Sequence, residues 1–563
     1  MTVTERENPA SALSAGGAER GWSAGNTGRA IIHGRAYFAE LHERIAAMGP
    51  GDRLYFTDWR GDPDQQLTDD PSSTLTATLT AAARRGVDVR GLLWRSHWRH
   101  FGYQSDTALF LGEEIGQAGG ECLRDMRVRT GGAHHQKFVV VRHAGDPSRD
   151  IAYVGGIDLC HSRRDDREHG GDVQALPMAA AYGPTPAWHD VQVAITGPAV
   201  HDVETTFRER WEDSTPLTLN PGRRLTSFLR REDQTPDPLG EQWPPPPPTG
   251  SEAVQIVRTY PVIRPVTYDF APEGERSIVL ANTKAMSRAR RLIYVEDQYF
   301  WGEQVGEHFA TRLREEPGLH LVVVLPMTPD VDSVVGHTTM LYARWLAMSR
   351  VLEAGGDRVA FFGLTNRAGL PIYVHSKVCV IDGVWASVGS DNLNRRSWSS
   401  DTEIAALVVP DGSDSGAPTF ASRLQRELVA EHLGCAQEDV PDDPVVLFET
   451  MVASAAALDQ WYAAASPPGA SGVRSLPGRA AARVRRADGR RMAKARTRSA
   501  GAAAGWVDRA VAAGDRPPGQ LRRLWPPELT RAHRAIGRAA YGVFDPDGTV
   551  GRDEDLEELA TGE

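Results

Sequence analysis

One short pattern, a histidine and a lysine separated by a single residue, occurs twice in this chain and constrains its fold more than any other feature. The first copy lies in "HHQKFVVV", at His135 and Lys137, and the second in "VHSKVCVIDG", at His375 and Lys377. Each copy runs into an apolar, β-branched stretch that is typical of a strand. Because residues i and i+2 of a strand share a face, the histidine and lysine of each copy should project together.

The segments around the two copies repeat as well. Each half of the chain reads as helix, strand, helix, strand, the strand that follows the histidine–lysine pattern, and then a glycine-containing strand. Amphipathic helices that alternate with short strands predict an α/β layer structure in each half. We therefore expect an α/β fold of two similar sandwich lobes, packed about a pseudo-twofold axis.

A proline run, "EQWPPPPPTGSE", separates the halves and is typical of a stiff, extended spacer. The expected organisation is a disordered leader (1–28), an N-terminal lobe (29–240), a Pro-rich linker (241–253), a C-terminal lobe (254–440) and a partly helical, partly disordered Arg/Ala-rich tail (441–563). We expect the tail to be a solvated extension. The alternative is an arm that docks on anionic lipid headgroups.

Composition narrows the class of protein. The chain has 563 residues, 41% hydrophobic and 24% charged, which is typical of globular domains. No apolar run is long enough to span a bilayer, and the first residues lack the apolar core of a signal peptide. Four cysteines without metal-ligand spacing fit reduced thiols. With a net charge of −11, nucleic acid is not an expected partner. These features predict a cytoplasmic monomer that contacts membranes at most peripherally.

The duplicated pattern supports phosphoryl chemistry if the two copies converge. Lysine ammonium groups suit phosphate oxygens and can offset charge in a transition state. One histidine can attack phosphorus and form a covalent intermediate. The other can protonate the leaving alcohol and then deprotonate the water or alcohol that follows. We expect this displacement to require no metal and no cofactor.

Each reactive imidazole needs an acceptor for its other ring nitrogen, which fixes the tautomer. Candidates are Asp190 in "AWHDVQV", downstream of the first copy, and Asp401 in "SSDTEIA", downstream of the second. Glu403 shares strand parity with Asp401 and is a further candidate.

The glycine-containing strands carry candidate substrate ligands. In "VGGID", Gly155 and Gly156 would let the backbone approach a ligand closely. In "VGSDN", Ser390 and Asn392 could donate to phosphate oxygens. Asp158 cannot donate when ionised, so it could instead hold Lys137 or a neighbouring arginine.

The second copy ends in Asp382, whereas the first copy has Arg142 at the matching position. Both positions have the opposite strand parity to the histidine and precede a turn. We therefore predict that Asp382 is a structural residue and that the first copy is active. Replacing Arg142 by aspartate should change stability more than turnover.

These features resemble the phospholipase D superfamily, and several segments are similar to its plant-type, phosphatidylcholine-hydrolysing branch: "HHQKFVVV", "YVGGIDLC", "WHDVQVAITGPAV", "FRERW", "IYVEDQYFW", "IYVHSKVCVIDG" and "SDTEIA". The resemblance implies two α/β lobes with the active site between them. It implies that His135 is the nucleophile and His375 the general acid/base. It further implies phosphate ligands at Lys137, Lys377 and Asn392, and imidazole partners at Asp190 and at Asp401 or Glu403.

The chain departs from that branch at Arg142 and at Asp297, where asparagine is usual, and we expect no N-terminal calcium-dependent lipid-binding domain. The function implied is hydrolysis of the distal phosphodiester of a glycerophospholipid, or transfer of its phosphatidyl group to an alcohol. The alternatives are a cardiolipin or phosphatidylserine synthase, a nuclease of the same superfamily, and a lipid-binding module without catalysis.

Overall fold

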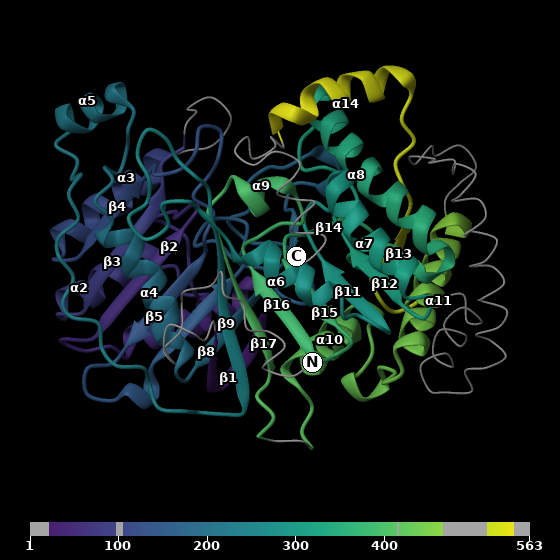
Figure 1. Cartoon of the computed structure of the whole chain (residues 1–563), viewed down its shortest axis with the longest axis horizontal. Helices are drawn as coiled ribbons and strands as arrows, with labels where there is room; N and C mark the ends of the chain where they lie inside the picture. Colours follow the sequence, from purple (N-terminus) through teal and green to yellow (C-terminus); the bar gives the residue numbers. More distant parts are fainter. Residues whose placement is uncertain (1–21, 97–104, 414–415, 466–514, 545–563) are drawn as a thin grey trace.

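The computed structural model describes residues 22–96, 105–413, 416–465 and 515–544. Its first sheet occupies the purple and blue half of the molecule (Figure 1). The strand order is β1 (Ser23–Ile32), β8 (Val191–Thr196), β6 (Ile151–Gly155), β5 (Phe138–Arg142), β2 (Arg53–Asp58), β3 (Asp88–Trp94) and β4 (Glu121–Asp125). Neighbouring strands are antiparallel from β1 to β2 and parallel from β2 to β4.

The second sheet repeats this arrangement strand for strand in the teal and green half. Its order is β9 (Glu252–Tyr260), β17 (Glu403–Pro410), β16 (Trp385–Gly389), β15 (Val378–Ile381), β11 (Leu292–Glu296), β12 (His320–Val324) and β13 (Val359–Thr365). The change from antiparallel to parallel pairing again falls at the strand after the histidine–lysine strand. The predicted α/β fold of two similar lobes is confirmed.

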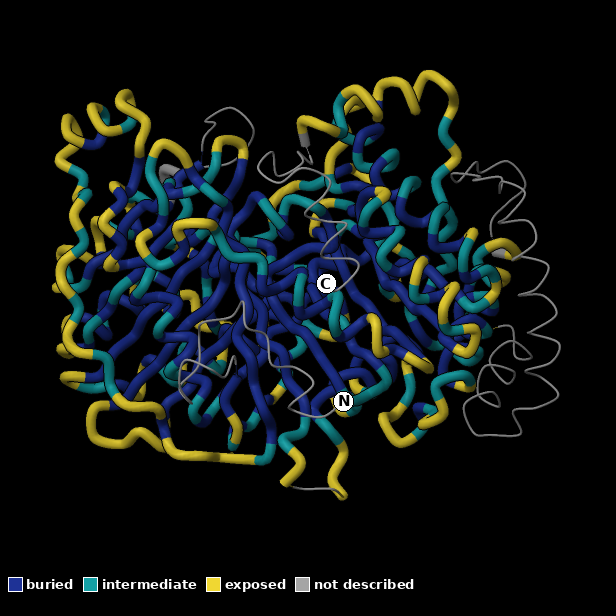
Figure 2. Tube along the Cα trace, viewed as in Figure 1, coloured by how far each residue is buried: buried dark blue, intermediate teal, exposed yellow. Residues whose placement is uncertain are grey.

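Helices cover both sheets. On the first lobe, α1 (Gly34–Ala46), α2 (Leu75–Arg84) and α3 (Ser105–Gln117) contribute to one core cluster; on the second, α6 (Ser277–Met286), α7 (Glu303–Glu315) and α8 (Val334–Gly355) contribute to its counterpart. A third cluster contains residues of both sheets together with α4 (Ala199–Glu212), α10 (Phe420–Leu433) and α11 (Pro444–Ala465). Buried stretches, dark blue in Figure 2, occupy the middle of both halves. The lobes therefore share a core.

Two strand pairings join the lobes. The edge strands β1 and β9 pair at Ser23↔Val254 and Asn26↔Glu252. The short strand β7 (Ala187–His189) belongs to the first half but runs parallel to β14 (Pro371–Val374) of the second. Because β7 ends next to Asp190 and β14 ends next to His375, this pairing brings a first-half carboxylate beside the second-half histidine.

Helix α10 has clear boundaries that fix its last turn. It begins after Thr419, whose side chain accepts a hydrogen bond from the Ser422 N–H at 3.0 Å, and it ends at Gly434, which has a left-handed φ of 67°. A threonine N-cap and a left-handed glycine are common helix signals. They position Glu431 and His432 on the final turn, where Glu431 contacts His33 of the first lobe and His432 contacts Glu296 of the second.

The parts of the tail that the structure describes join the folded body. The strand β18 (Leu521–Leu524) pairs antiparallel with β13, and α14 (Arg531–Phe544), yellow in Figure 1, packs along α8. We had expected a solvated extension, but four apolar and basic residues add a strand to the sheet edge. The Arg-rich stretch 474–498 and residues 1–21 of the expected leader lie outside the described residues. The first strand begins at Ser23, inside the range expected as leader.

The remaining elements are short: β10 (Glu275–Arg276), α5 (Pro221–Leu229), α9 (Arg395–Ser399) and 3₁₀ turns at Pro147–Arg149, Ala180–Tyr182, Gly356–Arg358 and Gln437–Asp439. Among the described helices, none combines the length and apolar character needed to cross a bilayer. All four cysteines lie in the described part and are free thiols.

Candidate active site

Both histidine–lysine segments lie just before a strand, and each is anchored by the other half of the chain. The His135 N–H donates to the Thr402 carbonyl at 2.9 Å, and the His375 N–H donates to the His189 carbonyl at 2.8 Å. We expected the pattern to lie within the strands, but β5 and β15 begin one residue after each lysine. The segments leave the sheet register because their backbone bonds cross to the opposite half.

The imidazole partners are exchanged between the halves. Nδ1 of His135 lies 2.9 Å and 3.0 Å from the two carboxylate oxygens of Glu403. Nδ1 of His375 lies 2.7 Å from Asp190 Oδ2. Each candidate acid thus holds the histidine of the opposite copy. The strand registers of β6–β8 and β16–β17 place the two acids at equivalent positions, so the exchange is reciprocal.

Asp401 is not brought to an imidazole. Its carboxylate accepts the Ala133 N–H at 2.8 Å and pairs with Arg396 at 2.9 Å. It therefore fixes the backbone that leads into the first copy. Of the two acids that the sequence left open in "SSDTEIA", Glu403 has the position of imidazole partner.

The Glu403 carboxylate is held by two serine hydroxyls. Ser390 donates to one oxygen, and Ser397, on α9, donates to the other at 2.7 Å. We had expected Ser390 to bind phosphate, but the structure turns its hydroxyl toward the carboxylate. Ser397 was not predicted, because it lies seven residues beyond Ser390 in a helix that has no counterpart signal in the first half.

The Asp190 carboxylate is held by Trp188 Nε1 at 3.3 Å and by the Val191 N–H at 2.9 Å. Burial raises the pKa of Asp190. The two glycines predicted to approach a ligand approach protein atoms instead. A Cβ at Gly156 would lie 2.2 Å from Asp190 Oδ1, and one at Gly155 would lie 2.4 Å from Gln192 Oε1. The lack of a side chain makes room for the Asp190 carboxylate at Gly156 and for the Gln192 amide at Gly155.

Lys137 is paired with Asp158 on the first side of the site. Its Nζ lies 3.3 Å from Asp158 Oδ1, and Arg163 donates to the other oxygen at 2.9 Å. Burial opposes ionisation of Asp158, but Lys137 and Arg163 outweigh it and hold the pKa well below its usual range. Asp158 therefore positions two cations. Arg163 was not predicted; its guanidinium lies 4.1 Å from the Trp188 ring, which in turn lies 4.9 Å from the His375 ring.

A second carboxyl, that of Asp58, adjoins the Lys137–Asp158 pair. Asp58, at the end of β2, accepts the Leu159 N–H at 3.0 Å. Burial raises its pKa well above the usual range, and the negative charge of Asp158 adds to the effect. The opposite shifts favour a protonated Asp58 beside an ionised Asp158, and the ionised carboxylate faces Lys137 and Arg163.

The charge of Lys377 is less well compensated than that of Lys137, which pairs with Asp158. Its Nζ donates to Gln298 Oε1 at 3.3 Å, and burial lowers its pKa to about 8. Burial, Lys377 and Arg163 together also lower the pKa of His375 well below its usual range. Asn392 is buried, and its side-chain Oδ1 has no hydrogen-bond partner among the described residues.

The segment "EDQYF" supports this side of the site. Asp297 accepts the backbone N–H groups of Tyr299 at 2.7 Å, Phe300 at 2.8 Å and Leu393 at 2.9 Å. Its carboxylate thus closes a turn. Gln298 also donates to the Tyr373 hydroxyl at 2.7 Å, which orients the amide oxygen toward Lys377.

Asp382 and Arg142 serve the fold at the far ends of their strands. The Asp382 carboxylate accepts backbone N–H groups from Arg290, Arg291 and Leu292 at 2.8–2.9 Å. Arg142 is buried between Asp150, at 2.7 Å, and Glu204. Both residues contact neighbouring loops and helices rather than His135 or His375. We had assigned them by strand parity with the histidines, but both histidines lie before their strands, so these contacts alone define their role.

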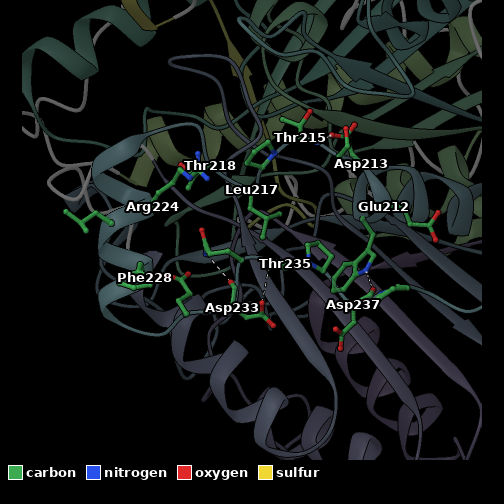
Figure 3. A pocket seen from close by; sticks show the side chains of 18 residues that line it. Glu212, Asp213, Thr215, Leu217, Thr218, Arg224, Phe228, Asp233, Thr235 and Asp237 are labelled. Carbon is green, nitrogen blue, oxygen red and sulfur yellow. Dashed lines mark hydrogen bonds between the residues drawn. The ribbon is translucent and has the colours of Figure 1, made fainter.

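A cavity of about 1030 Å³ lies in the first lobe beside α5 (Figure 3). Its lining consists of residues 211–218, 224, 225, 228 and 232–238. None of the four histidines and lysines of the repeated pattern contributes to that lining, so we do not assign the cavity to their chemistry.

Two family models match this chain. The family model described as "Phospholipase D" matches residues 66–327, and the one described as "Cardiolipin synthase, PLD-like domain" matches residues 283–428. Phospholipase D gamma 2 of Arabidopsis thaliana is 26% identical over 482 residues, covering 64% of this chain and 55% of that protein. Phospholipase D alpha 1 of Ricinus communis is 27% identical over 486 residues, covering 65% and 59%. The chain spans little more than half the length of these relatives.

Among solved structures, the phosphatidylserine synthase of Haemophilus influenzae Rd KW20 is similar to this chain with a TM-score of 0.48 and 14% identity, covering 73% of this chain and 86% of that one.

Proposed function

The chain carries phospholipase D superfamily domains, and from this premise we propose that it is a phosphodiesterase acting on glycerophospholipids. The observation that carries the proposal is the reciprocal pairing of two histidines with two carboxylates, each pair built from both halves. A carboxylate on Nδ1 holds the proton there and leaves Nε2 for chemistry. Two imidazoles prepared in this way suit a two-step displacement at phosphorus.

In the first step, Nε2 of His135 attacks phosphorus, and the bond from phosphorus to the leaving alcohol oxygen breaks. His375 gives that oxygen its Nε2 proton, so the alcohol leaves neutral. Burial and Lys377 favour neutral His375 in the free protein, as its lowered pKa reflects. A bound phosphodiester anion adds negative charge and favours the protonated form that this step requires.

In the second step, neutral His375 accepts a proton from water while the water oxygen attacks the phosphohistidine. The bond between phosphorus and His135 Nε2 breaks, and both imidazoles return to their starting state. Lys137, Lys377 and Asn392 are the proposed ligands of the phosphate oxygens. Both lysines are buried and their charges lower the pKa of His375. Asn392 is buried, and its backbone N–H donates to the Ser397 hydroxyl that holds Glu403.

An alcohol in place of water would give phosphatidyl transfer by the same steps. The match of residues 283–428 to a cardiolipin synthase-like model favours this as the second candidate function. A phospholipid substrate would bring the protein to a membrane surface, so we propose peripheral contact with that surface.

The test is a screen of phospholipid classes in mixed micelles, with and without a primary alcohol. We expect headgroup release, and a phosphatidyl-alcohol product when the alcohol is present. Both should disappear in His135→Ala and in His375→Ala and persist in His42→Ala. His42 is a suitable control because it lies on α1 and contacts Thr78, away from both histidine–lysine segments.

Two results would overturn the proposal. Nicking of plasmid DNA without lipid turnover would indicate a nuclease. Retained binding to lipid vesicles without turnover of any diester would indicate a lipid-binding module.

A further inference from the structure

A second cluster of titratable side chains lies behind the site and takes no part in the proposed reaction. It consists of His33, before α1; His169, in the loop after β6; His189, at the end of β7; and Glu431, on the last turn of α10. The three histidines are almost completely buried, and Glu431 is nearly so. His33 and His169 have left-handed backbone φ angles of 72° and 52°, which non-glycine residues adopt rarely.

The donor atoms of the cluster surround one point. Glu431 oxygens lie 2.8 Å from His33 Nε2, 3.1 Å from His169 Nε2 and 3.5 Å from His189 Nδ1. One donor atom from each residue lies within 4.8 Å of all the others. In a tetrahedral zinc site, ligands at about 2.0–2.1 Å from the metal are separated by roughly 3.3 Å. The cluster therefore needs little contraction to bind an ion of this size.

The rings do not stack on one another. The His33 ring lies edge-on to the rings of His169 and His189, with centroids 4.9 Å and 5.1 Å apart. One nitrogen of each ring nevertheless lies within 4.8 Å of the other donor atoms. Nδ1 of His189 is fully buried and makes no hydrogen bond among the described residues. A buried polar atom without a partner is costly, and coordination to a metal would satisfy it.

The cluster also has the surroundings of a metal site. Nε2 of His189, the nitrogen that faces away from the cluster, lies 2.8 Å from Glu296. Glu296 in turn contacts His432, Ser376 and Tyr294 at 2.6–2.8 Å. Histidine ligands commonly contact a carboxylate through their second nitrogen, which fixes the tautomer that binds the metal.

Access from solvent is open on one side. A cavity of about 530 Å³ is lined by His33 and Glu431 at the cluster, and by Asp166, Glu427 and Cys435 toward the surface. A metal ion could therefore reach the donors without unfolding of the lobes.

We propose that His33, His169, His189 and Glu431 bind a single Zn²⁺ ion. Three imidazoles and one carboxylate are an ordinary zinc ligand set. The ion would clamp three first-half histidines to the second-half helix α10. It would also position Asp190 and His375, because His189 precedes Asp190 and its carbonyl accepts the His375 N–H. The ion takes no part in the chemistry at phosphorus.

The sequence predicted no metal, and this site gives no sequence signal. Its ligands are spread from position 33 to position 431, so no short spacing connects them.

The test uses the full chain, stripped of metal and then dialysed against Zn²⁺. We expect about one zinc per chain by elemental mass spectrometry and a higher thermal midpoint with zinc than without it. His33→Gln and His169→Gln should bind less than a tenth of that zinc and lose the thermal shift. His42→Gln should behave as the unchanged chain, and His135→Ala should keep its zinc while losing turnover. The last variant separates this site from the proposed function.

Reconstitution of the unchanged chain with Co²⁺ gives a readout that does not depend on any variant folding. We expect the intense visible absorption of tetrahedral Co²⁺, displaced by one equivalent of Zn²⁺. Zinc well below one per chain with no thermal shift, or a weak octahedral Co²⁺ spectrum, would overturn the proposal. The cluster would then be a hydrogen-bonded histidine–glutamate network.

Discussion

The Gly156→Ala variant tests how the carboxylate of Asp190 is positioned. The new methyl carbon would lie 2.2 Å from Asp190 Oδ1 and 3.1 Å from the His375 carbonyl oxygen. Ordinary contact begins near 3.4 Å, so the carboxylate must move by about 1 Å. That shift would break its 2.7 Å contact with His375. Misplacement of a catalytic group by about 1 Å costs on the order of 100-fold in rate.

The assay is kcat on a soluble phosphodiester, measured together with the thermal midpoint. We expect kcat to fall on the order of 100-fold, with the variant still folded. The matched control is Gly145→Ala, because a Cβ at Gly145 would meet no atom within 4 Å. If Gly156→Ala turned over within about threefold of the unchanged chain, Asp190 would not be the group that orients His375.

Three further predictions concern Arg142, the acids Glu403 and Asp401, and Lys377. Arg142→Asp removes the cation from a buried cluster of carboxylates, so the free energy of unfolding in denaturant should drop by about 3–5 kcal/mol. Turnover per folded molecule should stay within about threefold. A tenfold gain in turnover would contradict a purely structural role for Arg142. Glu403→Gln should lower kcat by about 10³-fold or more, because the amide can donate to Nδ1 and stabilise the wrong tautomer of His135. Asp401→Asn should lower kcat by less than about tenfold. Equal losses in the two variants would show that Asp401 also acts on the imidazole. The value of kcat/KM should fall as pH rises through about 8, because burial lowers the pKa of Lys377 to that value and its ammonium group loses its charge above it. A kcat/KM that stays constant well above pH 8 would contradict a phosphate-binding role for Lys377.

The sequence predicted much of the fold because the same order of helices and strands occurs in both halves of the chain. Strand runs such as those of β5 and β15 recur with the same neighbours, so the order of elements in one half checks the other. What it could not predict was the joining of the halves. The pairing of β7 with β14 and of β18 with β13 depends on which sheet edges lie exposed after folding. A four-residue strand in a basic tail carries no distinguishing pattern.

The candidate site was predictable in its residue types and less so in its partnerships. His135, His375 and the two acids were identified from the repeat, but the exchange of acids between halves is a property of the assembled lobes. Spacing alone left Asp401 and Glu403 equivalent. Gly156 was expected to approach a ligand, and it approaches the Asp190 carboxylate instead. The glycine at position 156 indicated a close approach, but only the structure identifies the approaching group as the Asp190 carboxylate.

The division of labour between the two histidines is the central claim, and a burst measurement tests it most directly. A lipid-like phosphodiester of p-nitrophenol has a leaving group that needs no protonation, so its first displacement does not require His375. The second displacement does, because water must be deprotonated. His375→Ala should therefore release about one p-nitrophenol per chain in a rapid burst and retain the phosphoryl group on the peptide that contains His135. His135→Ala should give no burst. A burst from His135→Ala with label on His375 would contradict the account, as would the absence of a burst and of label in both variants.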